Sequence, residues 1–316
     1  MDTAIDVCGL TRTFFVPPKD VKGIRALLAR TSPIFALQDA TFQIPMGQRV
    51  ALIGSNGSGK STLIKILSGI IHPTDGTARV LGHTPWERRH RYLRRLGVMF
   101  GQKSLLFPDL TLQDALDLYK TLYALSASQY AKRIEHLDGC LRFTHLLNRP
   151  TRKLSLGERM RCEVVAALLH DPDLLILDEP TIGMDSETQT GLLRLLTETL
   201  RSDQTLLLTT HDAHFAQTVC SHTLSMANGR TGAHMPLNAA DLGPDRVRIF
   251  IKYTAKSHGI ALPPNATLIT ENPNSLCIEC HLKDEQDIKR RLVTDFSVTE
   301  LTVETAPLRS KCLGSP

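Results

Sequence analysis

The stretch GSNGSGKST (residues 54–62) lies between a strand-like run, RVALI (residues 49–53), and a helical pattern, LIKILSGI. It is the phosphate-binding pattern GxxxxGK[ST] in the strand–loop–helix context that the pattern requires. Backbone N–H groups of such a loop and the positive end of its helix point at a bound phosphate. The stretch therefore predicts a nucleotide cradle made of Gly54, Ser55, Asn56, Gly57, Ser58, Gly59, Lys60, Ser61 and Thr62. Lys60 is expected to reach the β- and γ-phosphate oxygens and Ser61 to offer its hydroxyl to Mg²⁺.

Two acidic residues follow another strand-like run, in DLLILDEP (residues 173–180). The continuous apolar run is typical of a central parallel strand, and ligands bind at the carboxyl ends of such strands. Asp178 is placed there to hold Mg²⁺ through water. Glu179 would point the other way on an extended chain and could accept the proton of an attacking water.

A third strand pattern, TLLLTTHD (residues 205–212), ends in the same manner beside His211. A histidine in isolation is usually an ordinary surface or core residue. At a strand end next to two others that carry phosphate chemistry, we interpret His211 as a γ-phosphate contact.

The stretch LSLGERMRCEVVAALLH (residues 154–170) reads as a capped helix. Ser155 followed by Glu158 has the spacing of a capping box, which would be a plain structural cap if it stood alone. A helix N-terminus also attracts anions, so the cap is a candidate second phosphate contact.

These motifs, in this order, resemble the ATP-binding-cassette (ABC) ATPases over roughly residues 5–235. The resemblance identifies LSLGE as the signature motif, usually LSGGQ. It implies that Ser155 and Gly157 bind the γ-phosphate of ATP held by a second copy of the chain. Leu156 replaces a glycine of the usual motif, and Glu158 replaces a glutamine and adds negative charge near the phosphate.

Three further positions match the family. Gln102, in VMFGQKSLLFPDLT, matches the Q-loop glutamine, which would sense the γ-phosphate and Mg²⁺ and link to a transmembrane partner. Asp185, in EPTIGMD, matches the acid of the D-loop, although that loop usually reads SALD. Phe14, in LTRTFF, is the expected stacking partner of adenine, with Phe15 or Phe35 as alternatives.

The resemblance implies an α/β fold, a P-loop NTPase cassette at residues 1–238 with a helical subdomain at about residues 103–170. Helical patterns within that subdomain cover LTLQDALDLYKTLYAL and SASQYAKRIEHL. Past a turn-rich linker near residues 235–245, four strand patterns and the helical pattern KDEQDIKRRLVTDF predict a small α+β domain at residues 245–316. We expect this domain to regulate the cassette or to brace a dimer.

Composition bounds the class of protein. Apolar residues make up 42% and charged residues 22% of the chain, which are ordinary values for a globular protein. No run approaches the roughly 20 apolar residues of a membrane span, and the N-terminus lacks a signal-peptide pattern, so we expect a soluble, unexported chain. Scattered cysteines indicate a reducing cytosol. The Cys277/Cys280 pair lies in an alternating strand pattern, which would put the two thiols on opposite faces, so a metal there is not expected.

Two basic stretches stand out. WERRHRYLRR (residues 86–95) is either a solvated helix face or a surface that meets anionic lipid headgroups or an acidic partner loop. KDVKGIRALLART (residues 19–31) predicts a short basic amphipathic helix that docks on a neighbouring chain or on a membrane surface. The net charge of +5 is too small to argue for a nucleic-acid partner.

The amino-acid sequences of several segments most resemble those of bacterial single-cassette ATPases of multidrug-type or sodium-type exporters. That resemblance implies an ATP- and Mg²⁺-dependent homodimer, peripheral on the cytoplasmic face of the inner (plasma) membrane, that drives separately encoded transmembrane permeases. One alternative is a polysaccharide or teichoic-acid export ATPase, although residues 245–316 are few for a carbohydrate-binding sandwich. Another is a soluble ABC protein acting on the ribosome or on DNA, although the chain has one cradle and no long insertion between cradle and signature.

Overall fold

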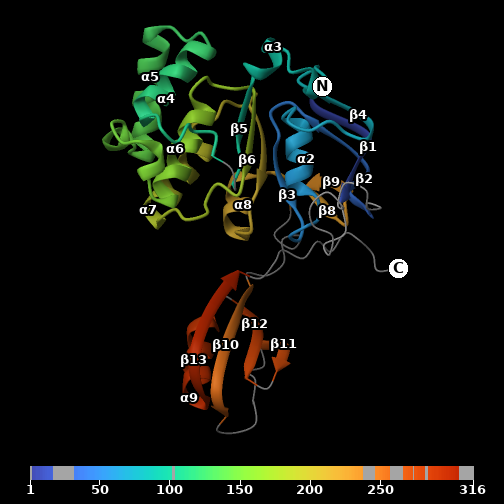
Figure 1. Ribbon diagram of the computed structural model, residues 1–316, viewed down its shortest axis with the longest axis vertical. Coiled ribbons are helices and arrows are strands. Elements are labelled where there is room, and N and C mark those ends of the chain that lie inside the picture. Colours follow the sequence, from blue (N-terminus) through green and yellow to red (C-terminus); the bar gives the residue numbers. More distant parts are fainter. Residues whose placement is uncertain are drawn as a thin grey trace, which may run out of the picture. The chain divides into compact units, whose positions relative to one another are not determined.

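The computed structural model of the chain describes residues 2–16, 32–101, 104–237, 246–256, 266–272, 274–281 and 284–305. These residues form two units (Figure 1). The first holds the described residues up to Thr210 together with Phe215–Leu237. The second holds His211–His214 together with the described residues from Arg246 onward.

Within the described residues, the first unit contains a six-stranded sheet of order β5-β6-β7-β3-β8-β9. All neighbouring pairs are parallel except β8 and β9. The strands are β3 (Arg49–Ile53), β5 (Leu96–Met99), β6 (Leu174–Asp178), β7 (Thr205–Thr209), β8 (His222–Ala227) and β9 (Arg230–Pro236). Every residue of β6 and β7 is buried, which explains why both read as unbroken apolar runs. The α/β fold and these central strands, expected from the sequence, are confirmed.

A second sheet of this unit is antiparallel and has the order β2-β1-β4 in the described chain. Its strands are β1 (Thr3–Val16), β2 (Ser32–Pro45) and β4 (Asp75–Val80). Helix α2 (Lys60–Leu67) lies between the two sheets (Figure 1), and its buried apolar side chains share one core with β1, β2, β6 and β7. The core thus fixes the start of α2 at the carboxyl edge of β3.

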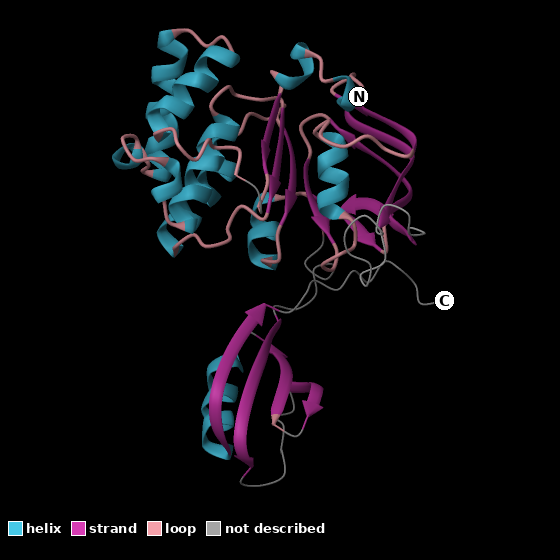
Figure 2. Ribbon diagram, viewed as in Figure 1, coloured by secondary structure: helices cyan, strands magenta, loops and turns pink. Residues whose placement is uncertain are grey.

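A group of helices lies on the β5 side of the large sheet (Figure 2). They are α4 (Leu112–Leu122), α5 (Ala127–Leu141), α6 (Leu156–Leu168) and α7 (Ser186–Arg194), which a π-helical turn (Leu195–Thr199) extends. Each of the four begins at a side-chain cap that accepts a backbone N–H, namely Thr111, Ser126, Ser155 and Asp185. The helices expected between the cradle and the signature are confirmed. Shorter pieces are η1 (Pro85–Glu87), α3 (His90–Leu93), η2 (Thr144–Leu146), η3 (Thr151–Lys153) and α8 (Ala213–Val219).

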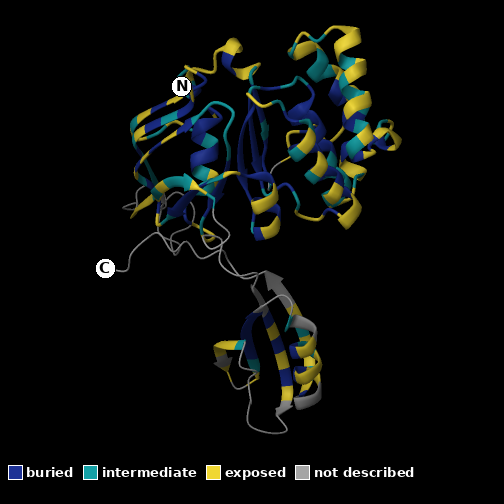
Figure 3. Cartoon of the chain, turned by 180° about the vertical axis from the view of Figure 1, so that it is seen from behind, coloured by how far each residue is buried: buried dark blue, intermediate teal, exposed yellow. Residues whose placement is uncertain are grey.

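The second unit is an antiparallel sheet of order β11-β12-β10-β13 in the described chain, with α9 (Glu285–Asp295) on one face (Figure 1). Its strands are β10 (Arg246–Lys256), β11 (Ala266–Asn272), β12 (Ser275–His281) and β13 (Phe296–Thr305). Residues 249–254 of β10 alternate between buried and exposed (Figure 3), as a strand with one covered face requires. Ile288 and Leu292 of α9 complete the core. The small α+β architecture is confirmed, and both Cys277 and Cys280 are buried in β12.

The basic stretch at residues 86–95 is not one helix, so the interpretation of this stretch as a solvated helix face is wrong. Arg88 adopts a left-handed conformation, with φ of 51°, and this ends η1 before α3 begins. Its guanidinium donates to the carbonyl of Gly69 at 2.7 Å. The basic segment at residues 19–31 lies within residues 17–31, outside the described residues. None of the described helices has the length and apolar character needed to cross a bilayer.

Candidate functional site: a phosphate cradle beside two acids

The loop before α2 has the backbone of a phosphate cradle. Gly59, at the N-cap of α2, has a φ of 107°, and no side chain of the described residues caps the helix. A Cβ at Gly59 would lie 2.4 Å from the carbonyl oxygen of Ala36, and one at Gly54 would lie 2.2 Å from that of Met226, so both positions demand glycine. The first N–H groups of α2 are therefore open to an acceptor from a ligand.

The other predicted cradle residues take different environments. Ser55, Asn56 and Gly57 are exposed, Ser58 is buried, and Thr62 is half-buried on α2. The exposed tip of the loop and the closely packed glycines at its two ends match a loop that wraps around a phosphate.

Lys60 lies between this loop and the two acids. Its Nζ donates to the carbonyl oxygens of Gly54, at 2.6 Å, and Ser55, at 3.1 Å. Burial lowers the pKa of Lys60, and the negative charges of Glu179 and Asp178 act in the opposite direction. The ammonium group is thus held among oxygen atoms that a phosphate could replace.

Asp178 ends β6 with two hydroxyl partners. Thr209 Oγ1 donates to Asp178 Oδ1 at 2.6 Å, and Ser61 Oγ donates to Oδ2 at 3.3 Å. A carboxylate and a hydroxyl side by side are the oxygen ligands that Mg²⁺ takes in nucleotide sites. The residues present therefore fit a magnesium ion beside the cradle.

Glu179 follows Asp178 but is not extended, so the expected geometry at this residue is wrong. Its φ is 51°, because β6 ends at Asp178 and the chain turns out of the sheet there. The Glu179 N–H donates to Thr209 Oγ1 at 3.0 Å and to the Thr209 carbonyl oxygen at 3.1 Å. Glu179 still lies close enough to Lys60 for their charges to interact.

Thr209 is the site residue that sequence reasoning missed. It is fully buried and lies directly opposite Asp178 in the parallel register of β6 and β7. The available signal was the pair of threonines that ends an apolar run at the carboxyl edge of a parallel strand. Polar residues at that edge face the ligand side of such a sheet.

Ser155 forms the capping box that the sequence predicted. The Glu158 N–H donates to Ser155 Oγ at 3.3 Å, and the Ser155 N–H donates to Glu158 Oε2 at 2.8 Å. These bonds, and an ion pair of 2.6 Å with Arg149, lower the pKa of Glu158. The negative charge that Glu158 brings to the signature is thus paired within the chain, while Ser155 itself is exposed.

The signature packs on the segment that holds Asp185. A Cβ at Gly157 would lie 2.3 Å from the carbonyl oxygen of Gly183, and the side chain of Leu156 also packs against Gly183. Leu156 therefore rests on the neighbouring loop. Asp185 accepts the N–H of Thr188 at 2.7 Å and caps α7, and these bonds lower its pKa.

The remaining predicted site residues are Phe14, Gln102 and His211. Phe14 is half-buried on β1, with the Arg12 guanidinium 4.6 Å from its ring centroid, whereas Phe15 and Phe35 are exposed. Gln102 lies outside the described residues. His211 lies two residues beyond β7 and groups with the second unit.

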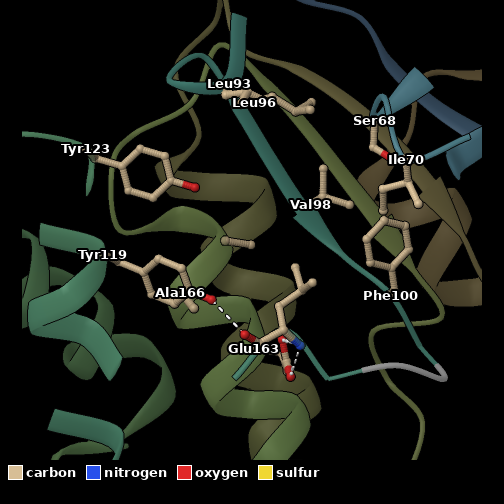
Figure 4. A pocket seen from close by; sticks show the side chains of 12 residues that line it. Ser68, Ile70, Leu93, Leu96, Val98, Phe100, Tyr119, Tyr123, Glu163 and Ala166 are labelled. Carbon is tan, nitrogen blue, oxygen red and sulfur yellow. Dashed lines mark hydrogen bonds between the residues drawn. The ribbon is translucent and has the colours of Figure 1, made fainter. Parts of the chain in front are cut away.

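An apolar groove of about 240 Å³ opens between α2, α3, β5, α4 and α6 (Figure 4). Tyr119 and Tyr123 line one side and Ile70 and Phe100 the other, as Figure 4 shows. The complete lining is Ser68, Ile70, Leu93, Leu96, Val98, Phe100, Leu105, Tyr119, Tyr123, Glu163, Ala166 and Ala167. Leu105 is 39% exposed there.

Hydrogen bonds hold Leu105, which lines the groove, to the neighbouring helices α4 and α6. The buried carboxylate of Glu163 accepts the N–H of Leu105 at 3.0 Å and a hydroxyl bond from Ser104. The hydroxyl of Tyr119 donates to the carbonyl oxygen of Leu105 at 2.8 Å. Burial raises the pKa of Glu163, and its hydrogen bonds oppose that shift. The segment that follows residue 103 is thereby fixed to both α4 and α6.

Comparison with known proteins agrees with this geometry. A family model described as "ABC transporter" matches residues 37–182. Nod factor export ATP-binding protein I of Ralstonia nicotianae is 32% identical over 237 residues, covering 74% of this chain and 73% of that protein. The ABC transporter ATP-binding protein NatA of Bacillus subtilis is 27% identical over 219 residues, covering 68% and 89%.

Solved structures show the same fold. An ATP-binding subunit of an ABC transporter shares 29% identity at a TM-score of 0.63, covering 74% of this chain and 90% of that one. A dimeric ATP-binding cassette in a post-hydrolysis state, bound to ADP and Pi, shares 24% identity at a TM-score of 0.59, covering 74% and 99%. The resemblance drawn from the motifs is confirmed: this chain belongs to the ABC transporter family, as an ATP-binding subunit with the P-loop cassette of an ATPase.

Proposed function

We propose that this chain is the energising subunit of an export system, binding MgATP between two copies of itself and driving separately encoded membrane permeases. The observation that carries the proposal is the hydrogen-bonded line from Ser61 through Asp178 and Thr209 to Glu179, beside an uncapped helix N-terminus. Acids gathered at a buried strand end cost free energy unless a ligand or a partner compensates their charge.

The cradle residues act on the phosphates. The N–H groups at the start of α2 and the ammonium of Lys60 bind the β- and γ-phosphate oxygens, and Phe14 stacks on adenine. Ser61, Asp178 and Gln102 would hold Mg²⁺. When bound, the ion neutralises phosphate charge that develops during the reaction.

Glu179 is the proposed general base. It lies beside Asp178 and within electrostatic reach of Lys60, so its carboxylate is close to the place where the phosphates would bind. His211, two residues beyond the end of β7, is proposed to contact the γ-phosphate. A water activated by Glu179 would then attack the γ-phosphorus.

A second copy of the chain completes each site in this proposal. Ser155 is exposed at the N-terminus of α6, where N–H groups and the helix dipole favour an anion. Gly157 packs directly on the loop before Asp185, so the signature and this acid would approach the partner's nucleotide together.

Lys60→Ala tests the cradle. Loss of a charge-assisted bond to phosphate is expected to weaken ATP binding by roughly 10- to 100-fold, because such bonds contribute about 1.5–3 kcal/mol. The measurement is nucleotide affinity by calorimetry. Lys153→Ala, which removes an exposed lysine from η3, serves as the control. Unchanged affinity in Lys60→Ala would remove the cradle assignment.

The groove is the proposed docking site for a cytoplasmic helix of the permease. Leu93, Leu105 and Ile70 expose apolar surface at its rim, which suits the apolar face of an amphipathic helix. Arg91 and Arg94 flank Leu93 and are exposed, and such side chains favour anionic lipid headgroups. Both features support a peripheral position on the cytoplasmic face of the inner membrane.

Leu93→Glu tests this docking. A carboxylate in the apolar groove is expected to abolish the stimulation of ATP hydrolysis by the permeases in reconstituted vesicles, because docking would bury the charge. Leu122→Glu is the matched control, since Leu122 is 58% exposed on α4 and does not line the groove. Full stimulation of Leu93→Glu, or equal loss in both variants, would contradict docking at this groove.

Export is the proposed direction. It is supported by the similarity to a protein named for Nod factor export, and no feature of the described residues favours action on a ribosome or on DNA. A direct assay of the system requires its permeases, which we expect to be encoded in adjacent reading frames. Neighbouring frames without multi-span proteins would argue against the export proposal.

A further inference from the structure

Thr209 bridges the two acids of the site with one side chain. Its hydroxyl donates to Asp178 Oδ1 and accepts the N–H of Glu179, so a line of hydrogen bonds runs from the Glu179 peptide to the Asp178 carboxylate. A hydroxyl carries a single proton and two lone pairs, which allows both bonds at once. Hydrogen bonds in such a chain polarise and strengthen one another.

The placement of the hydroxyl is rigid. Threonine is branched at Cβ and restricted at χ1, and Thr209 is fully buried in a central strand. Glu179, in contrast, holds a left-handed conformation that costs free energy for a residue with a side chain. The bond from its N–H to Thr209 helps to hold that conformation.

We propose that Thr209 is a positioning residue for ATP hydrolysis, which orients the metal-holding carboxylate of Asp178 and the peptide of Glu179 through one hydroxyl. The proposal rests on the roles proposed above for these two acids. Its hydroxyl fixes Oδ1 of Asp178, which leaves Oδ2 to face Ser61. The bond that the hydroxyl accepts from the Glu179 N–H fixes the backbone from which the Glu179 carboxylate projects.

The other end of the same strand offers a matched control. Thr205 is also fully buried in β7, and its hydroxyl accepts the N–H of Gly47 at 2.9 Å. It lies opposite Leu174, at the end of the strands away from Asp178. Thr205→Val and Thr209→Val therefore each remove one buried threonine hydroxyl from the same strand. Each change also leaves one backbone N–H, of Gly47 or Glu179, with one hydrogen bond fewer.

The experiment compares Thr209→Val, Thr209→Ser, Thr205→Val and Glu179→Gln in the purified full chain. Thr209→Val is expected to lower kcat by roughly 10- to 100-fold, as for loss of a hydrogen bond to a charged group. Thr209→Ser should recover to within about threefold of the wild type, because its hydroxyl can remake both bonds. Thr205→Val should lose thermal stability to a similar extent and keep its turnover.

A binding measurement separates positioning from strand stability. The affinity for ADP is measured by calorimetry with and without Mg²⁺. Mg²⁺ is expected to increase the affinity for ADP about tenfold less in Thr209→Val than in the wild type. In Thr205→Val, the increase in affinity should equal that of the wild type. Equal turnover in the two valine variants, or an intact Mg²⁺ gain in Thr209→Val, would overturn the proposal.

Glu179→Gln shows whether a negative result concerns the proposed role of Glu179 or only the role of Thr209. If Glu179→Gln hydrolyses ATP normally, the proposed role of Glu179 is wrong and the positioning role falls with it. If Glu179→Gln is inactive while Thr209→Val is fully active, only the inference about Thr209 has failed.

Discussion

Glu179→Gln is expected to bind ATP with wild-type affinity and to hydrolyse it roughly 10²–10⁴ times more slowly, the range typical of losing a general base. The amide cannot take a proton from water, yet it keeps the size of the side chain and the backbone bonds to Thr209. Because the nucleotide stays intact, ATP-bound dimers should accumulate. Steady-state turnover and size-exclusion chromatography with ATP measure the two effects.

The control for this prediction is an acid-to-amide change elsewhere. Glu187 is 73% exposed in its side chain and pairs with Arg142 on the surface of the helices, so Glu187→Gln should leave hydrolysis unchanged. Near-normal turnover in Glu179→Gln would remove this residue from the role of base. The site would then need another acceptor for the proton.

Ser155→Arg is expected to leave folding and the first ATP binding event intact while abolishing ATP-driven dimerisation and most hydrolysis. The substitution puts bulk and charge at an exposed helix N-terminus, where the phosphate of the partner's nucleotide is proposed to dock. Loss of the cap itself costs about 0.5–2 kcal/mol, which is too little to unfold a domain of this size in most cases. Dimerisation with ATP and turnover are the measurements.

A neighbouring helix provides the matched control. Ser126 caps α5 with the same kind of capping box, formed with Gln129, and it is also exposed. Ser126→Arg should therefore cost comparable stability and leave dimerisation and hydrolysis near the wild-type level. If the two arginine variants behave alike, the cap at Ser155 is only structural.

The sequence predicted those parts of the site that depend on local pattern. The glycines around Lys60 and the helix behind them belong to one contiguous stretch, and the apolar run before Asp178 identifies a buried strand without any knowledge of its neighbours. The cap at Ser155 likewise needs only residues three apart. For these elements the local preference and the final fold agree.

The parts that could not be predicted depend on pairing between distant segments. Thr209 meets Asp178 only because β6 and β7 adopt one parallel register, which no local pattern of either strand fixes. The turn that takes Glu179 into the left-handed region depends on the same contact. Glu163 reads as an ordinary helix-surface residue, yet it is buried because a loop almost sixty positions earlier folds onto it.

If each ATP lies between the cradle of one chain and the signature of another, forced heterodimers should differ in activity according to which chain carries each substitution. In one arrangement, one chain carries Ser155→Arg and the other carries Lys60→Ala. Both substitutions then fall in the same ATP site, and the second site keeps its wild-type Lys60 and Ser155. In the other arrangement, both substitutions are on one chain opposite a wild-type chain, and both sites are spoiled. We expect residual ATP hydrolysis in the first heterodimer and essentially none in the second. Equal residual activity in the two heterodimers would contradict this placement of ATP.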